Sequence, residues 1–445
     1  MLLVCPLAAF GGRAAAVAIP FGLAAVLFAA VLRPAVARRG PLRTLDVTLC
    51  ALAAYLFIQS VPFPGIAVHA VSPRAAVVRG ALTLEPVVAR AWLPLSIDTR
   101  ATIWASVVTA GAIALFLAAR AVFSHGGVRQ TARGISAIGL AVSAVAIAQA
   151  ATAGRMIYWR FPTEYEGPLP FGPFVNRNHF ATWVIMAAPV CLGYLAARAT
   201  RTESANASAV NWRTRLARMA DGRTLWLTAA GAIMIGALLL SLSRSGTVSL
   251  AGAATVAALL FRQRVTRGRG WWLAAAVTVT IGLGVSRADL PALADRFTRS
   301  GSSVENRVRI WKDTAPILRD FWLTGTGAGT YRTAMLYYQR SERNVQFNQA
   351  HNHYLQMMAE GGAIAFALAG CALIALARAV PERLAADVSG GYWIRVGAVT
   401  GLMAVALQSL WETGLVMPAN AALAAVLAAI AIHERLPSEK SILRD

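Results

Sequence analysis

The chain has 445 residues, of which 57% are hydrophobic and 14% charged, and its mean hydropathy is +0.56. Soluble proteins carry about a quarter charged residues, so this composition excludes an ordinary soluble protein and indicates a polytopic membrane protein. The formal net charge of +22 would suit a nucleic-acid partner, but in a membrane protein the distribution of basic residues among the loops must be read first.

Apolar segments of membrane length recur along the chain. A helix needs about 17 to 22 apolar residues to cross a bilayer core of roughly 30 Å, and we count about eleven such segments. The segments are continuous and rich in Ala and Leu, which favours helices over the alternating strands of a barrel. They lie near residues 14–32, 45–61, 101–122, 134–153, 180–197, 224–242, 246–261, 271–286, 361–378, 394–413 and 417–433.

Basic residues gather in every second connection between these segments. By the positive-inside rule those connections are cytoplasmic, which predicts an outside N-terminus and an inside C-terminus. The outward connections are then 62–100, 154–179, the turn at Arg244 and the long loop 287–360. The basic connections hold Arg33, Arg38, Arg39, Arg43, Arg120, Arg129, Arg133, Arg198, Arg201, Arg213, Arg215, Arg218, Arg223, Arg262, Arg264, Arg267, Arg269, Arg378, Arg383 and Arg395.

Two further features are the N-terminal residues and the cysteines. Residues 1–12 leave open an extra re-entrant or partial membrane segment, and we expect no cleaved signal because no basic region precedes the apolar stretch. The four cysteines are far apart and form no CxxC motif, which favours small buried hydrophobic residues over a disulfide or a metal site. They are Cys5, Cys50, Cys191 and Cys371.

The outward loop 154–179 leads into the sequence Gly-Pro-Phe-Val-Asn-Arg-Asn-His-Phe-Ala at 172–181, directly before a predicted span. Arg177 and His179 at such a helix entry, with its exposed backbone donors, favour binding of an anion. The alternative is an ordinary helix start with Asn178 as its cap. Glu164 and Glu166 in the same loop would suit acid/base work or a cation, but two carboxylates in a loop are more often solvated.

A single arginine, Arg244, stands in the turn Ser-Leu-Ser-Arg-Ser-Gly at 241–246, where two apolar helices meet. An arginine at this depth is costly and usually faces a cavity, a partner or an anionic ligand. Extension of its side chain to the membrane interface is the alternative.

The first motif of the long outward loop lies on a predicted helix. The start signal Ser-Ser-x-Glu at 302–305 predicts a helix to about Leu318, with Arg307 and Trp311 on one face and Arg309 elsewhere. A guanidinium group can bind two phosphate oxygens at once, whereas a solvated arginine on an amphipathic helix is the alternative. The following Gly-Thr-Gly-Ala-Gly at 325–329 would let backbone amides approach an anion. It lacks the context of a nucleotide-binding motif, which favours a tight, flexible turn.

The loop ends in Ala-His-Asn-His-Tyr-Leu at 350–355, where the chain re-enters the membrane. A neutral imidazole at His351 can accept a proton from a hydroxyl nucleophile near neutral pH, and an interfacial histidine bonded to backbone is the alternative. His353 invites a zinc interpretation, but no HExxH motif or Cys/His cluster accompanies it. We therefore expect no metal and no cofactor.

Taken together, these motifs resemble the O-antigen ligase and O-antigen polymerase (Wzy-type) superfamily of bacterial membrane glycosyltransferases. The resemblance rests on the motif at 172–181, Leu-Ser-x-Ser-Arg-x-Gly ending at Gly246, and Arg-x-x-x-Trp at 307–311. Asp-Phe-Trp-Leu-Thr-Gly-Thr-Gly-x-Gly-Thr-Tyr at 320–331 and Ala-His-Asn-x-Tyr-Leu-Gln at 350–356, followed by Glu360 and Gly361, complete the set. The motifs span roughly residues 170–365, and only their order and topology together are specific.

The resemblance implies an activity and roles for individual residues. Members of the superfamily move a glycan from an undecaprenyl-diphosphate carrier to an acceptor hydroxyl at the outer face of the inner membrane, without a metal. His351 is then the catalytic base, and Arg244 and Arg307 bind the diphosphate. The resemblance further implies supporting residues around them, namely Arg177, His179, Asn352 and Tyr354.

The expected architecture is an all-α, polytopic membrane protein of about eleven to twelve spans with a large, partly helical periplasmic loop, GT-C-like in class. We expect one membrane domain over 1–445: a bundle at 14–286, the catalytic loop at 287–360, C-terminal helices at 361–433 and a cytoplasmic tail at 434–445. Ligase, polymerase and protein O-oligosaccharyltransferase activities stay open. A flippase for the same lipid-linked sugars is the rival class, but it would place its polar groups at mid-membrane.

Overall fold

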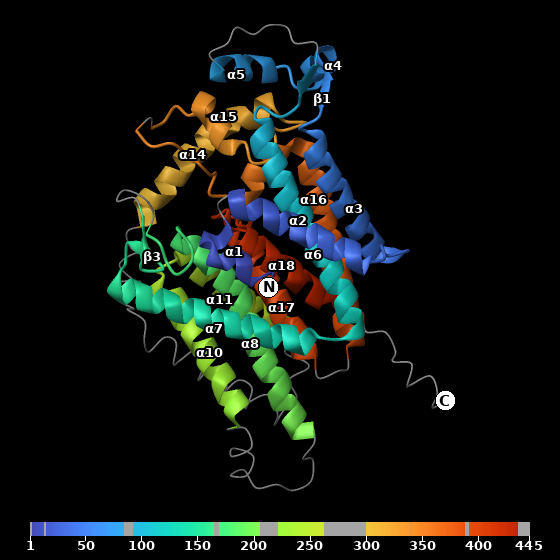
Figure 1. Ribbon diagram of the computed structural model, residues 1–445, viewed down its shortest axis with the longest axis vertical. Coiled ribbons are helices and arrows are strands. Elements are labelled where there is room, and N and C mark those ends of the chain that lie inside the picture. The colour runs from blue at the N-terminus through green and yellow to red at the C-terminus, as the bar shows by residue number, and fades with distance from the viewer. Residues whose placement is uncertain are drawn as a thin grey trace.

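A computed structural model describes residues 2–12, 15–83, 92–163, 169–204, 221–261, 300–342, 344–387 and 391–434. The predicted span 271–286, the start of the long loop at 287–299, Glu164, Glu166 and the tail from residue 435 lie outside these ranges. The described part is almost entirely helical, which confirms the predicted all-α class (Figure 1).

The first half of the chain forms helices joined by short strand pairs. Its elements are α1 Val4–Ala8, η1 Phe10–Gly12, α2 Ala15–Leu32, α3 Gly40–Ile58, β1 Pro62–Pro64, α4 Gly65–Val71, α5 Ala75–Leu82, β2 Trp92–Pro94, α6 Thr99–His125, α7 Val128–Thr152, β3 Met156–Ile157, β4 Phe161–Pro162 and α8 Arg177–Ser204. Strand β1 pairs antiparallel with β2, with Phe63 opposite Leu93, and β3 pairs antiparallel with β4.

The second half contains the remaining helices. They are α10 Gly222–Leu240, α11 Arg244–Phe261, α14 Ser300–Asp320, α15 Tyr331–Tyr338, α16 His353–Ala386, α17 Tyr392–Gln408, η3 Gly414–Val416 and α18 Pro418–Ile432. The helix predicted over 302–318 is thus present as α14. Every predicted apolar segment that falls within the described ranges overlaps a helix, although the segment 394–413 extends beyond the end of α17 at Gln408.

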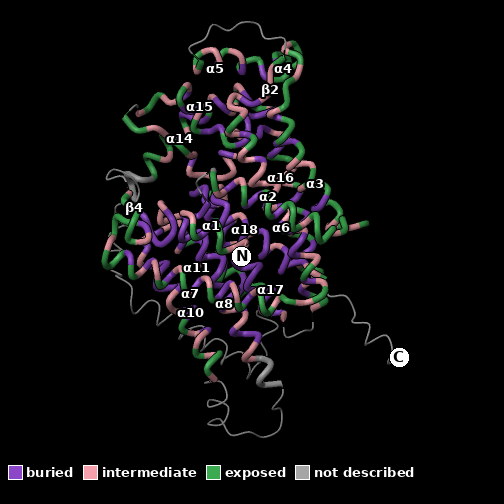
Figure 2. Tube along the Cα trace, in the orientation of Figure 1, coloured by how far each residue is buried: buried purple, intermediate pink, exposed green. Residues whose placement is uncertain are grey.

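Six described helices are long and apolar enough to cross a membrane: α3, α6, α7, α8, α10 and α16. Among them α8 is central, since 89% of its most apolar window is buried, against 22% for α3 and α16. Helices α7, α10, α11, α17 and α18 pack around α8, and α2 and α3 pack outside on α6 and α16 (Figure 2). The core is therefore built on α8, and the outer helices keep apolar faces exposed.

The N-terminal residues form two short helical turns that pack against this core. The Tyr158 hydroxyl donates to the Leu7 carbonyl oxygen at 2.7 Å, and Gly12 lies directly against Pro418. The cysteines are free thiols, but only Cys191 is buried. The expectation that all four are buried is wrong for the other three, because their helices turn those faces outward.

Side-chain caps set where several helices begin. Asp98 accepts a hydrogen bond from the Ala101 amide at the start of α6, and Asp221 accepts one from Thr224 at the start of α10. At the start of α16, Asn352 accepts one from Leu355 at 3.0 Å. Because capping satisfies amides that have no partner within the helix, it determines where the chain leaves a loop and enters the apolar bundle.

Two of the connections predicted to face outward, 62–100 and the long loop, contact each other. Helices α4, α5, α14 and α15 form one end of the molecule (Figure 1), where the Ile97 amide donates to the Thr326 carbonyl oxygen at 2.8 Å. At the opposite end Arg395 binds Asp387 at 3.1 Å and the Ala431 carbonyl oxygen at 2.7 Å.

Candidate active site

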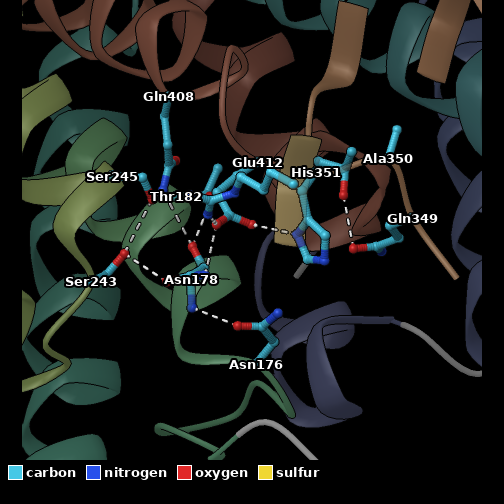
Figure 3. A network of polar contacts seen from close by, with 12 residues as sticks. Asn176, Asn178, Thr182, Ser243, Ser245, Gln349, Ala350, His351, Gln408 and Glu412 are labelled. Carbon is cyan, nitrogen blue, oxygen red and sulfur yellow. Dashed lines mark hydrogen bonds and ion pairs between the residues drawn. The ribbon is translucent and has the colours of Figure 1, made fainter. Parts of the chain in front are cut away.

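A buried carboxylate, Glu412, lies in the connection between α17 and η3, among residues from several connections that were predicted to face outward (Figure 3). Its side chain is 1% exposed. Its Oε1 accepts hydrogen bonds from Arg307 Nη2 at 2.7 Å and from Asn178 Nδ2 at 2.8 Å. Its Oε2 lies 3.4 Å from His351 Nδ1. One carboxylate thus joins residues from three of the predicted motifs.

The surroundings of Glu412 favour its ionised form. Burial by itself raises the pKa of this carboxyl, but the hydrogen bond with His351 and the charges of His351, Arg307 and His179 more than offset that effect. The net result is a pKa below the ordinary glutamate value. A carboxylate removed from water stays charged when it is paired and hydrogen-bonded in this way.

Asn178 connects this carboxylate to the turn that carries Arg244. Asn178 Oδ1 accepts from the Ser243 hydroxyl at 2.9 Å, and its backbone carbonyl oxygen accepts from Gln408 Nε2 at 3.5 Å (Figure 3). The expected alternative role of Asn178 as the cap of its helix is wrong. Asn176 has that position, because its Oδ1 accepts from the Asn178 amide at 2.8 Å.

Helix α14 brings two side chains to the site from one face, as the spacing predicted. Arg307 binds Glu412, and one turn later Trp311 Nε1 donates to the Ala350 carbonyl oxygen at 2.9 Å. Arg309 points elsewhere and pairs with Glu305 at 2.8 Å. The helix therefore positions a guanidinium group and also anchors the residue before His351.

His351 itself is held in an uncommon backbone conformation with φ of +49°. Non-glycine residues in this region cost energy and are found where the surrounding structure requires them. Here the segment is fixed on both sides: Ala350 N donates to Gln356 Oε1 at 3.1 Å, and Asn352 caps α16. The imidazole is 33% exposed, so one ring nitrogen faces Glu412 while solvent or a ligand can reach the ring.

The glycine-rich loop after α14 binds an internal carboxylate. Gly329 N and Tyr331 N donate to Glu360 at 2.8 and 3.2 Å, and Gln356 Nε2 donates to the same side chain at 3.1 Å. The tight turn predicted for this segment is present. The amides of Gly329 and Tyr331 are used inside the protein, so they are not available to an external phosphate.

The other predicted site residues stand on the elements that carry the partners of Glu412, or on elements packed against them. Arg177 and His179 begin α8 beside Asn178, and His179 is 6% exposed. Arg244 begins α11 between two serines of the turn that contacts Asn178, and its side chain is half-buried. Tyr354 donates from its hydroxyl to the Ala406 carbonyl oxygen at 2.9 Å, which ties α16 to α17.

A cavity of about 540 Å³ opens next to the His351 segment. Its walls are mainly apolar and come from α3, α6, α16 and the start of α18. Polar side chains at its lining include Thr109, Tyr331, Arg332, Asn348, Gln349, His353, Gln356 and Glu360. Within the described ranges no group of three or more His, Cys, Asp or Glu side chains has the arrangement of a metal site.

Glu412 was not among the residues that sequence reasoning selected. The available signal was a lone acid in Trp-Glu-Thr-Gly at 411–414, at the end of a predicted apolar segment. Such a carboxylate needs partners if it is buried, and the basic residues on the same side offered them. Its position was not apparent because it stands outside the motif region and inside the predicted span 394–413, whereas α17 ends at Gln408.

One family model matches part of the chain. Residues 229–370 match the family model described as O-antigen ligase (Wzy_C). The match confirms the resemblance of this part of the chain to the O-antigen ligase and polymerase superfamily. The matched segment contains Arg244, Arg307 and His351 and ends before Glu412. No curated protein matches the chain.

Proposed function

We propose that this protein transfers a glycan from an undecaprenyl-diphosphate carrier to an acceptor hydroxyl at the periplasmic face of the bacterial inner membrane. The family match supports transfer of the O-antigen ligase or polymerase type. The observation that carries the residue assignment is the convergence of Arg307 and His351 on one buried carboxylate, Glu412. This arrangement holds a cation and a proton acceptor at a fixed separation.

The proposed reaction is a single inverting displacement. The acceptor oxygen attacks the anomeric carbon from the face opposite the diphosphate, and the bond between that carbon and the diphosphate oxygen breaks. Undecaprenyl diphosphate leaves with the electron pair, and His351 takes the hydroxyl proton. Arg307 and Arg244 offset the charge that develops on the leaving group. Arg177 and His179 add positive or polar groups near the same position.

The apolar cavity supports a lipid-linked donor. Leu52, Leu56, Val108 and Ala112 line it, while Gln349 and His353 lie on either side of the His351 position in sequence. A prenyl chain in this cavity would bury apolar surface, which is the main favourable term for such a ligand. We place the carrier's prenyl chain there, with its diphosphate toward Arg307 and the acceptor on the side of His351.

The decisive experiment measures transfer by purified, membrane-reconstituted protein from an undecaprenyl-diphosphate-linked glycan. His351→Ala should lose at least about 10²-fold in rate because no base remains. Arg307→Ala should lose a similar factor because the leaving group is no longer stabilised. Arg309→Ala is the matched control on the same helix and should retain transfer. Full activity in both site variants would refute the assignment.

Ligase and polymerase share this donor chemistry and differ in the acceptor. The glycan phenotype of a deletion strain separates them. Lipid A core without attached polymer indicates a ligase, whereas single repeat units without chain extension indicate a polymerase of O-antigen or exopolysaccharide. Loss of glycan from a protein instead identifies a protein O-oligosaccharyltransferase.

A further inference from the structure

Building on the proposed function, we propose that Glu412 is the positioning residue of the reaction: it orients His351 as the base and holds Arg307 beside it. The two roles follow from the two oxygens of one carboxylate. Oε2 faces His351 Nδ1 at 3.4 Å, and Oε1 binds Arg307 Nη2 at 2.7 Å.

The contact with Nδ1 selects one form of the imidazole. A neutral histidine carries one N–H, and the ionised carboxylate accepts but cannot donate. The proton of neutral His351 therefore stays on Nδ1, toward Glu412, and the lone pair lies on Nε2. Nε2 is then the atom that receives the acceptor's proton, and Glu412 stabilises the resulting imidazolium without taking the proton itself.

The contact with Arg307 leaves part of the guanidinium group for the substrate. Nη2 is engaged by Glu412, while Nε and Nη1 can donate to phosphate oxygens. Because the same rigid carboxylate binds both side chains, it sets the separation between the base and the group that stabilises the leaving diphosphate. Such separations matter because small misplacements of reacting groups cost large factors in rate.

The position of Glu412 is itself determined by neighbouring elements. Asn178 donates to Oε1 at 2.8 Å and is held in turn by Ser243. The charged and titratable groups that face the carboxylate in the described structure are Arg307 from α14, His179 from α8 and His351 from the segment before α16. With two histidines and an arginine around it, the carboxylate is the negative centre of the site.

The test uses the full-length, reconstituted protein and the undecaprenyl-diphosphate-linked glycan as the probe. Glu412→Gln keeps the size and removes the charge, and Glu412→Asp keeps the charge one methylene further back. Glu305→Gln is the matched control, since Glu305 is an exposed carboxylate on α14 that pairs with Arg309. Transfer is measured across pH for each, with the amount of folded protein determined in parallel.

We expect Glu412→Gln to lower kcat by at least about tenfold. The acid limb of the pH–rate profile of this variant should also move to lower pH, because the negative charge that favours the imidazolium form of His351 is gone. Glu412→Asp should recover part of the rate with an acid limb near that of the native protein, and Glu305→Gln should match the native protein in both.

Two outcomes would overturn the inference. One is a Glu412→Gln variant with native rate and native pH profile. The other is a loss of rate with an unmoved acid limb and no recovery in Glu412→Asp, since a purely structural role lowers activity equally at every pH. In either case loss of activity in His351→Ala and Arg307→Ala leaves the proposed function standing, whereas retained activity in those two removes the function itself.

Discussion

Among single residues, Glu412 shows most clearly how burial and pairing act together. A carboxylate with 1% exposure is unfavourable by itself, yet its pKa lies below the ordinary value because His351, Arg307 and His179 surround it. The sequence selected His351 and Arg307 as candidate site residues because of the motifs in which they stand. It could not predict their common partner, because a lone glutamate in a short turn has no pattern around it.

The lowered pKa of Glu412 predicts how the stability of the folded protein depends on pH. The folded-state pKa of Glu412 is below the ordinary 4.5, so the folded protein binds fewer protons here than the unfolded chain. The stabilisation is complete at neutral pH and is lost as the pH falls from about 4.5 through the folded pKa.

Thermal unfolding in detergent at a series of pH values tests it. Glu412→Gln should have a lower Tm than the native protein at pH 7, and this difference should shrink as the pH falls below about 4.5. The exposed Glu305→Gln serves as control and should show little difference at any pH. A gap between native protein and Glu412→Gln that stays constant with pH would contradict the assignment.

Among the elements, α16 and the glycine-rich loop depend on each other. Helix α16 is interrupted at Gly362, with φ of 62° and ψ of −168°, and the loop enters at this break. Ala363 N donates to the Trp322 carbonyl oxygen at 2.8 Å, and Gly327 N donates to the Glu360 carbonyl oxygen at 2.9 Å. Because of this break, backbone groups of α16 are free to form hydrogen bonds with the glycine-rich loop. The break comes after the first segment of α16, the helix that begins just after His351.

Alanine substitution of two glycines in α16 tests whether the break requires glycine, since one glycine lies at the break and the other in the regular part of the helix. A Cβ at Gly362 would lie 2.3 Å from the Leu323 carbonyl oxygen, and only glycine readily adopts its φ and ψ. We expect Gly362→Ala to destabilise the protein by about 1–3 kcal/mol or more. Gly370→Ala meets nothing within 4 Å and should be neutral or slightly stabilising.

The measurement is the Tm of both variants in the same detergent, together with transfer activity. Gly362→Ala should lower both, since the glycine-rich loop is hydrogen-bonded to this junction and α16 begins directly after His351. Equal Tm values for the two variants would show that the interruption of α16 is not required for stability.

For the whole molecule, the sidedness that the arginines predict stays a prediction, and contacts between the connections bear on it. The connections predicted to face outward contact one another around Glu412 and in the cap of α4, α5, α14 and α15. At the other end, Arg395, Asp387 and the carbonyl oxygen of His433 are joined, and Phe123 packs against His433. We propose that the cap end is periplasmic.

Labelling in intact cells tests this orientation. In a variant without the four native cysteines, Val345→Cys in the loop before His351 should react with a membrane-impermeant maleimide. His125→Cys, at the end of α6, should react only after the membrane is opened. Val345 is 57% exposed, and His125 is exposed as well, so access through the protein is not limiting. The reverse labelling pattern would show that the topology is the opposite of the proposed one.

The sequence by itself determined the membrane class, the helical segments within the described ranges, and Arg307 and Trp311 on one helix face. Apolar length and helical spacing are local properties, which is why they could be read without a structure. Only the tertiary structure decided that Glu412 joins residues 105 and 234 positions away, and that Glu360 uses the amides of the glycine-rich loop. Those contacts depend on how α8, α14 and the α17–α18 connection pack, and no local pattern encodes which polar groups then meet.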